Sequence, residues 1–279
     1  MKTPDRTLMI KSLLLLLFTL IIQSYTGSGR LSSQKLKEEA WKFPKRDTLS
    51  LEILGSTKVF ISGSASGEID IKLRYIERPD EIFEVKEMQR AVYLKENILD
   101  YDSHRPTQTY FEEWTWTINV PHGTFIKCFG SSGDFEVNDF SGSFKADFGS
   151  GRFVFENIDG SIEMSLAQLY AQLHNSKGSF RVSSAGGSIR ATDLTITGSS
   201  SFTSGMGSVK ISLAQMPAAD LYVCSSFNKV QVSFKGHPVT GSFEFIAMAD
   251  KGRIISPFKF DYMETFLDDI KSYRNSSDF

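Results

Sequence analysis

The chain has 279 residues with a net charge of −2, and 41% of them are hydrophobic, 23% charged and 13% aromatic. This content of apolar and aromatic residues excludes an intrinsically disordered chain, and a total of 2 cysteines excludes a disulfide-rich framework. The near-neutral charge also argues against nucleic acid as a partner, because proteins that bind phosphate backbones carry a basic excess.

Residues 1–26 have the pattern of a secretory signal peptide. Basic residues precede an apolar run from Leu13 to Ile22, and small or polar residues follow it. The run is shorter than the roughly 20 apolar residues that a membrane-spanning helix needs, so a cleaved signal is favoured over an uncleaved anchor. We therefore expect an exported protein with no transmembrane span after cleavage, in the periplasm, on the cell surface or outside the cell. Residues 27–47 are predicted to be an N-terminal linker.

A glycine-led pattern recurs along the chain. Each copy reads glycine, polar, apolar, polar, apolar, as in Gly133-Asp134-Phe135-Glu136-Val137. Copies begin at Gly133, Gly142, Gly160, Gly178, Gly187, Gly207 and Gly241. Strict alternation over four or five residues predicts a strand with one buried face, and the glycines suit the turns between strands.

A longer period appears when alternate copies are superposed. Asp139, Asn157, Asn175 and Asp193 then fall in step, and Asn and Asp suit tight corners because they tolerate left-handed backbone conformations. Coils of about 18–20 residues, each pairing with the next at about 4.8 Å, predict an all-β fold: a single-stranded β-solenoid, or β-helix-like, repeat. A sandwich of hairpins is the alternative, but it would more often show Asn-Gly or Asp-Gly turns than this chain does.

The solenoid is predicted to span residues 48–258. Gly67-Glu68-Ile69-Asp70-Ile71 repeats the motif and is assigned to an early coil, whereas the charge-rich residues 76–112 are expected to form edge strands with excursions. Alternation resumes after them, and it places Trp114 and Trp116 on the apolar face.

Residues 259–279 are predicted to form a short helix and a tail. Met263, Phe266, Leu267 and Ile270 follow helical spacing behind an Asp-x-x-Glu capping box. An element that covers the last coil would protect both its apolar core and its unpaired strand edge. We interpret the segment as a C-terminal capping helix, with a frayed tail as the alternative.

Few residues have the spacing that metal binding or catalysis needs. The 4 His residues are scattered singly, so no metal site is predicted. Residues 130–135 are weakly similar to a calcium-binding nonapeptide repeat, but the recurring Asp of such sites is missing. A polysaccharide-cleaving solenoid needs converging carboxylates, for which Asp134, Glu136 and Arg152 are candidates. We assign no catalytic residue and no cofactor, and predict that the protein is not an enzyme.

Cys128 and Cys224 are the one pair that export could oxidise. About five coils separate them, or roughly 24 Å along the axis, whereas a disulfide needs Cα atoms within about 7 Å. We therefore predict two separate, buried thiols.

An aromatic and acidic insertion is the candidate binding surface. Exposed aromatic rings beside carboxylates are common in sugar and peptide sites. The predicted patch consists of Tyr101, Tyr110, Phe111, Glu112 and Glu113.

Three segments together carry a resemblance to a known family. They are residues 116–124, with a strand ending in Val-Pro-x-Gly, residues 132–135, with a Ser-Gly-Asp-apolar step, and residues 251–258, with a closing Gly-x-Ile-x-Ser pattern. In these segments the chain resembles the bacterial putative-adhesin family of exported, glycine-punctuated β-repeat domains of unknown function. The resemblance implies a β-solenoid-like fold at the cell envelope and offers no catalytic residues to transfer.

The sequence therefore favours a non-enzymatic, exported, adhesin-like protein of the cell envelope or surface. It would bind envelope or extracellular proteins or glycans through a flat face. Outward side chains would stack there in ladders, with candidates at Glu136, Lys145, Glu163, Arg181 and Arg190. Two alternatives stay open: an envelope-stress regulatory or sensing protein that acts through a membrane partner, and a polysaccharide-active β-helix enzyme.

Overall fold

The computed structural model describes residues 36–55, 57–76, 81–98, 114–238, 243–248, 262–266 and 270–275. These residues form strands and turns, and none of them forms a helix. Accordingly, the described part of the chain contains no helix long and apolar enough to cross a membrane. One sheet has 17 strands, and a second sheet has 3.

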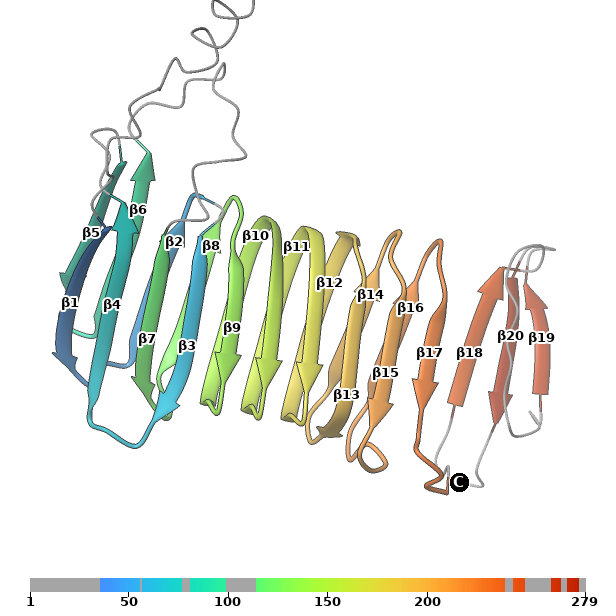
Figure 1. The fold of residues 1–279 in the computed structure, drawn as a ribbon. Coiled ribbons are helices and arrows are strands. Elements are labelled where there is room, and N and C mark those ends of the chain that lie inside the picture. Colours follow the sequence, from blue (N-terminus) through green and yellow to red (C-terminus); the bar gives the residue numbers. More distant parts are fainter. Residues whose placement is uncertain are drawn as a thin grey trace, which may run out of the picture.

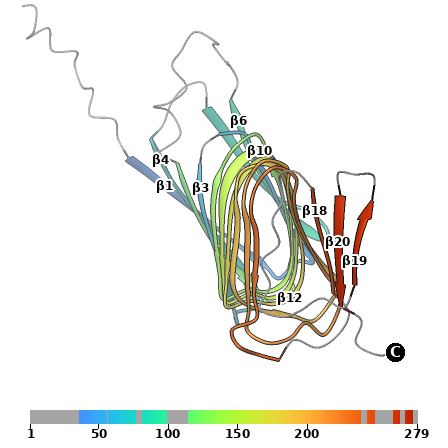
Figure 2. The same cartoon turned by 90° about the vertical axis from the view of Figure 1, so that its right-hand side faces the viewer.

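The large sheet winds into two walls that enclose a common interior, as the end-on view in Figure 2 shows. The first wall consists of β5 (Glu81–Glu87), β6 (Ala91–Ile98), β2 (Thr48–Ile53), β8 (Phe125–Gly130), the first halves of β10 (Ser141–Glu156) and β11 (Asp159–His174), β12 (Lys177–Gly186), β14 (Ser200–Ser204) and β16 (Leu221–Ser225). The second wall consists of β1 (Leu36–Pro44), β4 (Glu68–Ile76), β7 (Thr115–Pro121), β3 (Lys58–Ser64), β9 (Asp134–Asn138), the second halves of β10 and β11, β13 (Ile189–Ile196), β15 (Val209–Leu213) and β17 (Val230–Ser233).

Successive coils from β8 onward pair in parallel, and Figure 1 shows them stacked side by side. Ser141 pairs with Asp159, and Asp159 pairs with Lys177, so each of these coils advances the chain by 18 residues. Later coils are slightly longer, because Val209 pairs with Ile189 on one side and with Val230 on the other. The predicted β-solenoid and its coil length are confirmed.

The corners of the coils lie where the sequence places them. Asp139, Asn157, Asn175 and Asp193 have φ angles of 51°, 57°, 45° and 58°, in the left-handed region that Asn and Asp tolerate. Gly160 has a φ of 156°, and a Cβ there would lie 1.9 Å from the carbonyl oxygen of Gly142 in the preceding coil. The residues at these corners are therefore of types that can adopt the left-handed backbone conformation or allow the close approach of the coils.

Apolar side chains of both walls fill the interior. Phe135 and Phe153 stack on neighbouring coils with their ring centroids 4.7 Å apart and their planes at 4°. Trp114 and Trp116 are buried, as the alternation predicts. Burial of this continuous apolar surface holds the coils together, because no single coil could bury its own apolar face.

The N-terminal strands depart from the sequence-based prediction. The motif copy that begins at Gly67 forms β4, which runs antiparallel to β1 and β7 and is not part of a parallel coil. The coil of β6 and β7 follows β2 and β3 in the chain, but it does not stack between them and the later coils. Instead, β2 lies between β6 and β8, and β3 lies between β7 and β9. Alternation marks which face of a strand is buried but not the direction of the strand, so the pattern does not fix this order.

The C-terminal strands also differ from the prediction. β18 (Phe243–Met248), β20 (Ile270–Asn275) and β19 (Tyr262–Phe266) form an antiparallel sheet, drawn beyond β17 in Figure 1. The prediction of a capping helix in residues 259–279 is wrong where the chain forms β19 and β20. The last three residues of the motif copy predicted at Gly241 belong to β18. Short apolar segments fit either period, and the aromatic and β-branched residues of these segments favour strands.

Candidate functional site

The predicted aromatic and acidic patch lies outside the described residues. Tyr101, Tyr110, Phe111, Glu112 and Glu113 all fall between β6 and β7, in residues 99–113. The patch therefore stays a prediction. Among the described residues, the candidates for binding are the outer faces of the two walls and the two ends of the solenoid.

The outer face of the first wall carries a charged ladder, which we define as Lys127, Lys145, Glu163 and Arg181. These residues pair in register on β8, β10, β11 and β12, so their side chains project side by side at about 4.8 Å spacing. Lys145 forms an ion pair with Glu163, and this hydrogen bond, together with the charge of Arg181, lowers the pKa of the Glu163 carboxyl. The ladder is thus partly neutralised by its own members.

Rows of hydroxyl groups flank this ladder. Ser143 and Ser161 pair in register on one side of it, and the Ser161 hydroxyl lies 2.9 Å from that of Ser143. Ser165 and Ser183 pair in register on the other side. From β10 to β12, the first wall therefore presents a polar outer face to solvent.

The outer face of the second wall divides into two parts. Near its middle, Arg152 of β10 forms an ion pair with Glu136 of β9, with a nitrogen–oxygen distance of 3.3 Å. Nearer its C-terminal end are three exposed cations, Arg190, Lys210 and Lys229, which we call the basic patch. The five predicted ladder residues therefore lie on both walls: Lys145, Glu163 and Arg181 share a row on the first, whereas Glu136 and Arg190 lie on the second.

The N-terminal end of the solenoid contains an aromatic cluster between the two walls. Trp41 packs edge-on against Phe83 with centroids 5.7 Å apart, and the ring of Tyr75 lies 5.4 Å from that of Trp114. The buried carboxylate of Glu96 accepts hydrogen bonds from the Trp116 indole and, at 2.9 Å, from the Thr57 hydroxyl. Because its polar partners come from β7 and from the turn before β3, this site links several N-terminal strands.

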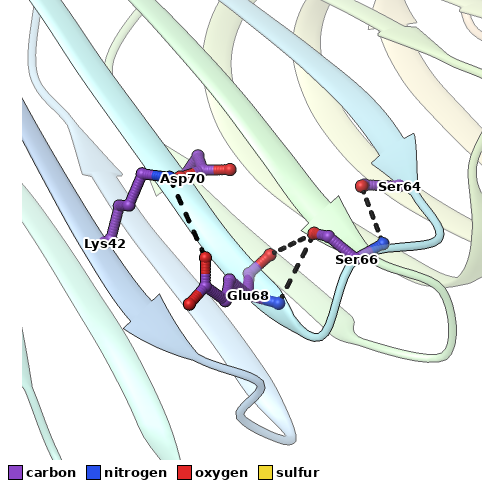
Figure 3. A network of polar contacts seen from close by, with 5 residues as sticks. All are labelled: Lys42, Ser64, Ser66, Glu68 and Asp70. Atoms are coloured by element: carbon purple, nitrogen blue, oxygen red, sulfur yellow. Dashed lines mark hydrogen bonds and ion pairs between the residues drawn. The ribbon is translucent and has the colours of Figure 1, made fainter.

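Polar contacts also fix the turn between β3 and β4 (Figure 3). The Ser66 backbone amide donates to the Ser64 hydroxyl at 3.0 Å, and the Ser66 hydroxyl donates to the Glu68 carbonyl at 3.1 Å. Lys42 of β1 lies 3.2 Å from Asp70 and 3.9 Å from Glu68. The charges in this region are therefore paired with one another, which suits a structural role.

Among the large apolar side chains of the described residues, the most exposed three belong to the C-terminal coils. Phe227 is 82% exposed, Met206 65% and Tyr222 60%. Phe227 lies beside Met206 at the corner where the chain leaves the first wall, since its amide donates to the carbonyl of Gly205 at 3.0 Å. The last coil thus has an exposed apolar corner between β16 and β17.

The candidate catalytic residues do not converge on a cleft. Asp134, Glu136 and Arg152 project from neighbouring strands of the flat outer face of the second wall, where Arg152 pairs in register with Asp134 and forms an ion pair with Glu136. Within the described ranges, no group of three or more His, Cys, Asp and Glu side chains is placed to hold a metal ion. The geometry of these residues is that of a solvated ion pair.

The two cysteines are separate thiols, as predicted. The pairing of β8, β10, β11, β12, β14 and β16 places Cys128 and Cys224 five coils apart. Cys128 is fully buried, which raises the pKa of its thiol, whereas Cys224 is only partly buried. The prediction of burial therefore holds for Cys128 and is wrong for Cys224, which lies on the last coil of the first wall.

Comparison with known proteins identifies similar solved structures. No protein-family model matches the chain, and no curated protein matches it by sequence. The chain is similar to a putative cell adhesion protein from Clostridium sporogenes, with 15% identity over 72% of this chain and 100% of that chain and a TM-score of 0.39. It is also similar to a putative adhesin from Bacteroides fragilis, with 16% identity over 72% and 97% of the two chains and a TM-score of 0.39. A putative lipid binding protein from Parabacteroides distasonis has 12% identity over 71% and 96%, with a TM-score of 0.36.

Proposed function

We propose that this protein is a non-enzymatic, exported, adhesin-like protein that binds envelope or extracellular proteins or glycans. The observation that carries the proposal is the two-walled β-solenoid, whose outer faces present side chains in straight rows at about 4.8 Å spacing. A ligand with regularly spaced groups can contact several coils at once. Many weak contacts on a rigid scaffold give useful affinity, because little conformational entropy is lost on binding.

Export is the part of the proposal that is tested first. A bacterial host would express the full-length chain with a C-terminal epitope tag, and protease would be added to intact and to lysed cells. Digestion on intact cells is expected for a surface protein, and protection until the outer membrane is opened is expected for a periplasmic one. Protection until the cytoplasmic membrane is broken would contradict export. A tagged cytoplasmic protein is the control for cell integrity.

Binding is tested with the purified full-length chain. The labelled protein would be added to intact cells over a range of concentrations, and saturable retention is expected. A heat-denatured sample of the same protein controls for adhesion of unfolded chains. Retention that rises linearly without saturation, or equals that of the denatured control, would contradict a specific binding function.

A further inference from the structure

The basic patch collects three cations from separate coils on one face. Arg190 of β13 pairs in register with Lys210 of β15, so their side chains project from neighbouring coils about 4.8 Å apart. Lys229 directly precedes Val230, which pairs with Val209, and it therefore lies one coil further on. All three side chains are exposed.

The basic patch is not neutralised by any carboxylate of the described residues. In that part of the chain, Arg190, Lys210 and Lys229 form no ion pair. The nearest carboxylate along β13 belongs to Asp193, and it already pairs with Lys235. Like charges on adjacent strands repel each other, so an anion bound at the patch would relieve this repulsion.

The charged ladder of the first wall shows the contrast. There, Glu163 lies between Lys145 and Arg181 in the same row and offsets part of their charge. In the row of the basic patch, Arg190 has Gln172 on one side and Lys210 on the other. In their row, Arg190 and Lys210 therefore have no carboxylate neighbour, whereas the row of the first wall has one between two of its cations.

The surroundings of the basic patch suit a sugar polymer. The outward positions beside it carry hydroxyl and amide groups: Ser188, Thr192, Ser208, Ser212, Gln172 and Gln231. Tyr170 is 43% exposed at the edge of this area, and its hydroxyl accepts a hydrogen bond from Gln172 at 2.7 Å. Exposed aromatic rings and hydroxyl groups pair well with sugar rings and their hydroxyls.

A protein partner fits this area less well. Protein interfaces depend on a central group of apolar and aromatic anchors that become fully buried. On β11, β13 and β15, strands that the structure describes throughout, Tyr170 is the one large hydrophobic side chain that is exposed. The exposed Met206 and Phe227 lie at the corners that precede β15 and β17, beyond Lys210 and Arg190. The face is flat, polar and positively charged.

We propose that the basic patch binds an anionic polysaccharide. Arg190 and Lys210 contact its carboxylate, sulfate or phosphate groups, and the neighbouring hydroxyl and amide side chains hydrogen-bond to the sugar hydroxyls. Adjacent coils let one polymer chain contact both cations together. This proposal rests on the proposed binding function and names the class of its ligand.

The test compares two double variants of the full-length chain. Arg190→Gln with Lys210→Gln removes two charges from the basic patch, and Lys58→Gln with Lys72→Gln removes two exposed charges from the other end of the same wall. Polygalacturonate, dextran sulfate and uncharged dextran would be immobilised as probes, and the dissociation constants measured by interferometry. Circular dichroism would show that both variants are folded.

The wild type is expected to bind an anionic polymer and not dextran, with an affinity that falls as salt is added. Loss of two exposed charge contacts in the Arg190/Lys210 variant is expected to weaken binding by about tenfold. The Lys58/Lys72 variant should bind as the wild type does. Preference for polygalacturonate would identify carboxylate groups, and preference for dextran sulfate would identify sulfate or phosphate esters.

Three results would overturn this proposal. They are wild-type binding to neither anionic polymer, equal weakening in both double variants, and equally tight binding to single-stranded DNA. On intact cells, equal retention of the wild type and the Arg190/Lys210 variant would also rule out the basic patch as the binding site. The proposed function itself would then still stand. Failure of the wild type to bind cells at all counts against the proposed function itself.

Discussion

Asn175 donates a hydrogen bond from its Nδ2 to the Oδ1 of Asn157, which lies one coil earlier at a distance of 2.7 Å. Asn157 in turn donates to Asp139 at 2.8 Å, so three left-handed corner residues form a continuous ladder. Along this edge, the side chains that permit the turn also join one coil to the next. The same residues therefore set both the local backbone conformation and the stacking.

Substitution of Asn157 separates these two contributions. Asn157→Ala removes both ladder hydrogen bonds and leaves a side chain without local polar contacts at a φ of 57°. We expect a loss of about 2–3 kcal/mol in the free energy of unfolding, from about 1 kcal/mol per hydrogen bond and the cost of the left-handed conformation. Asn157→Gly should lose less, because glycine adopts this conformation freely. Urea unfolding measures both, and equal losses would show that backbone conformation plays no part.

Gly160 tests how closely the coils approach each other. Gly160→Ala would put a Cβ 1.9 Å from the carbonyl oxygen of Gly142, where only the backbone could move away. We expect a loss of about 2 kcal/mol or more, or a failure to fold. Gly67→Ala is the matched control, because nothing lies within 4 Å of its added Cβ. If thermal unfolding shifted equally for both variants, close approach would not be the reason for glycine at position 160.

The regular part of the solenoid could be predicted because its signals are local. Glycine and Asn or Asp recur where the backbone conformation demands them, and alternation marks the buried face. The pairing of the two cations in the basic patch could also be predicted from the sequence, since Arg190 and Lys210 occupy the same position of two motif copies. Copies on the same wall come from alternate units, so superposing those units places the two cations side by side.

The N-terminal end could not be predicted in this way. Glu96 takes the next inward position after Val92 and Leu94, although its side chain is charged. It is buried at 4% exposure because Trp116 and Thr57 donate hydrogen bonds to its carboxylate. These partners come from distant segments, and the coil order that unites them depends on antiparallel excursions. No local pattern specifies such contacts, whereas a buried charge requires them.

The two thiols should differ in reactivity. Cys128 is buried and the pKa of its thiol is raised by burial, so it should not react with a thiol reagent in the folded protein. Cys224 is partly exposed and should react. We expect one reactive thiol per folded chain and two after denaturation without reductant. In Cys224→Ser, no thiol should react in the folded protein. A titre of zero in the denatured protein would mean a disulfide and would contradict the coil register.

Tyr93 and Glu52 give the solenoid a pH-dependent contact on the first wall. The pKa of the Tyr93 hydroxyl is raised to about 12. Burial is the largest cause, and the hydrogen bond that Tyr93 donates to Glu52 is the second. Burial alone would raise the pKa of Glu52, but hydrogen bonds from Lys95 and Tyr93 outweigh it and lower this pKa. The contact therefore joins a protonated phenol to an ionised carboxylate.

The sign of the pH dependence follows from the raised pKa of Tyr93. A folded-state pKa above the unfolded value of about 10 means that the contact stabilises the protein fully below that pH. This contribution is lost as the pH rises through about 12. Phenolate absorbance should show a step near pH 12 that is missing in Tyr93→Phe, and the step should move to lower pH in Glu52→Gln. A step at the same pH in wild type and Glu52→Gln would show that the hydrogen bond does not hold the proton.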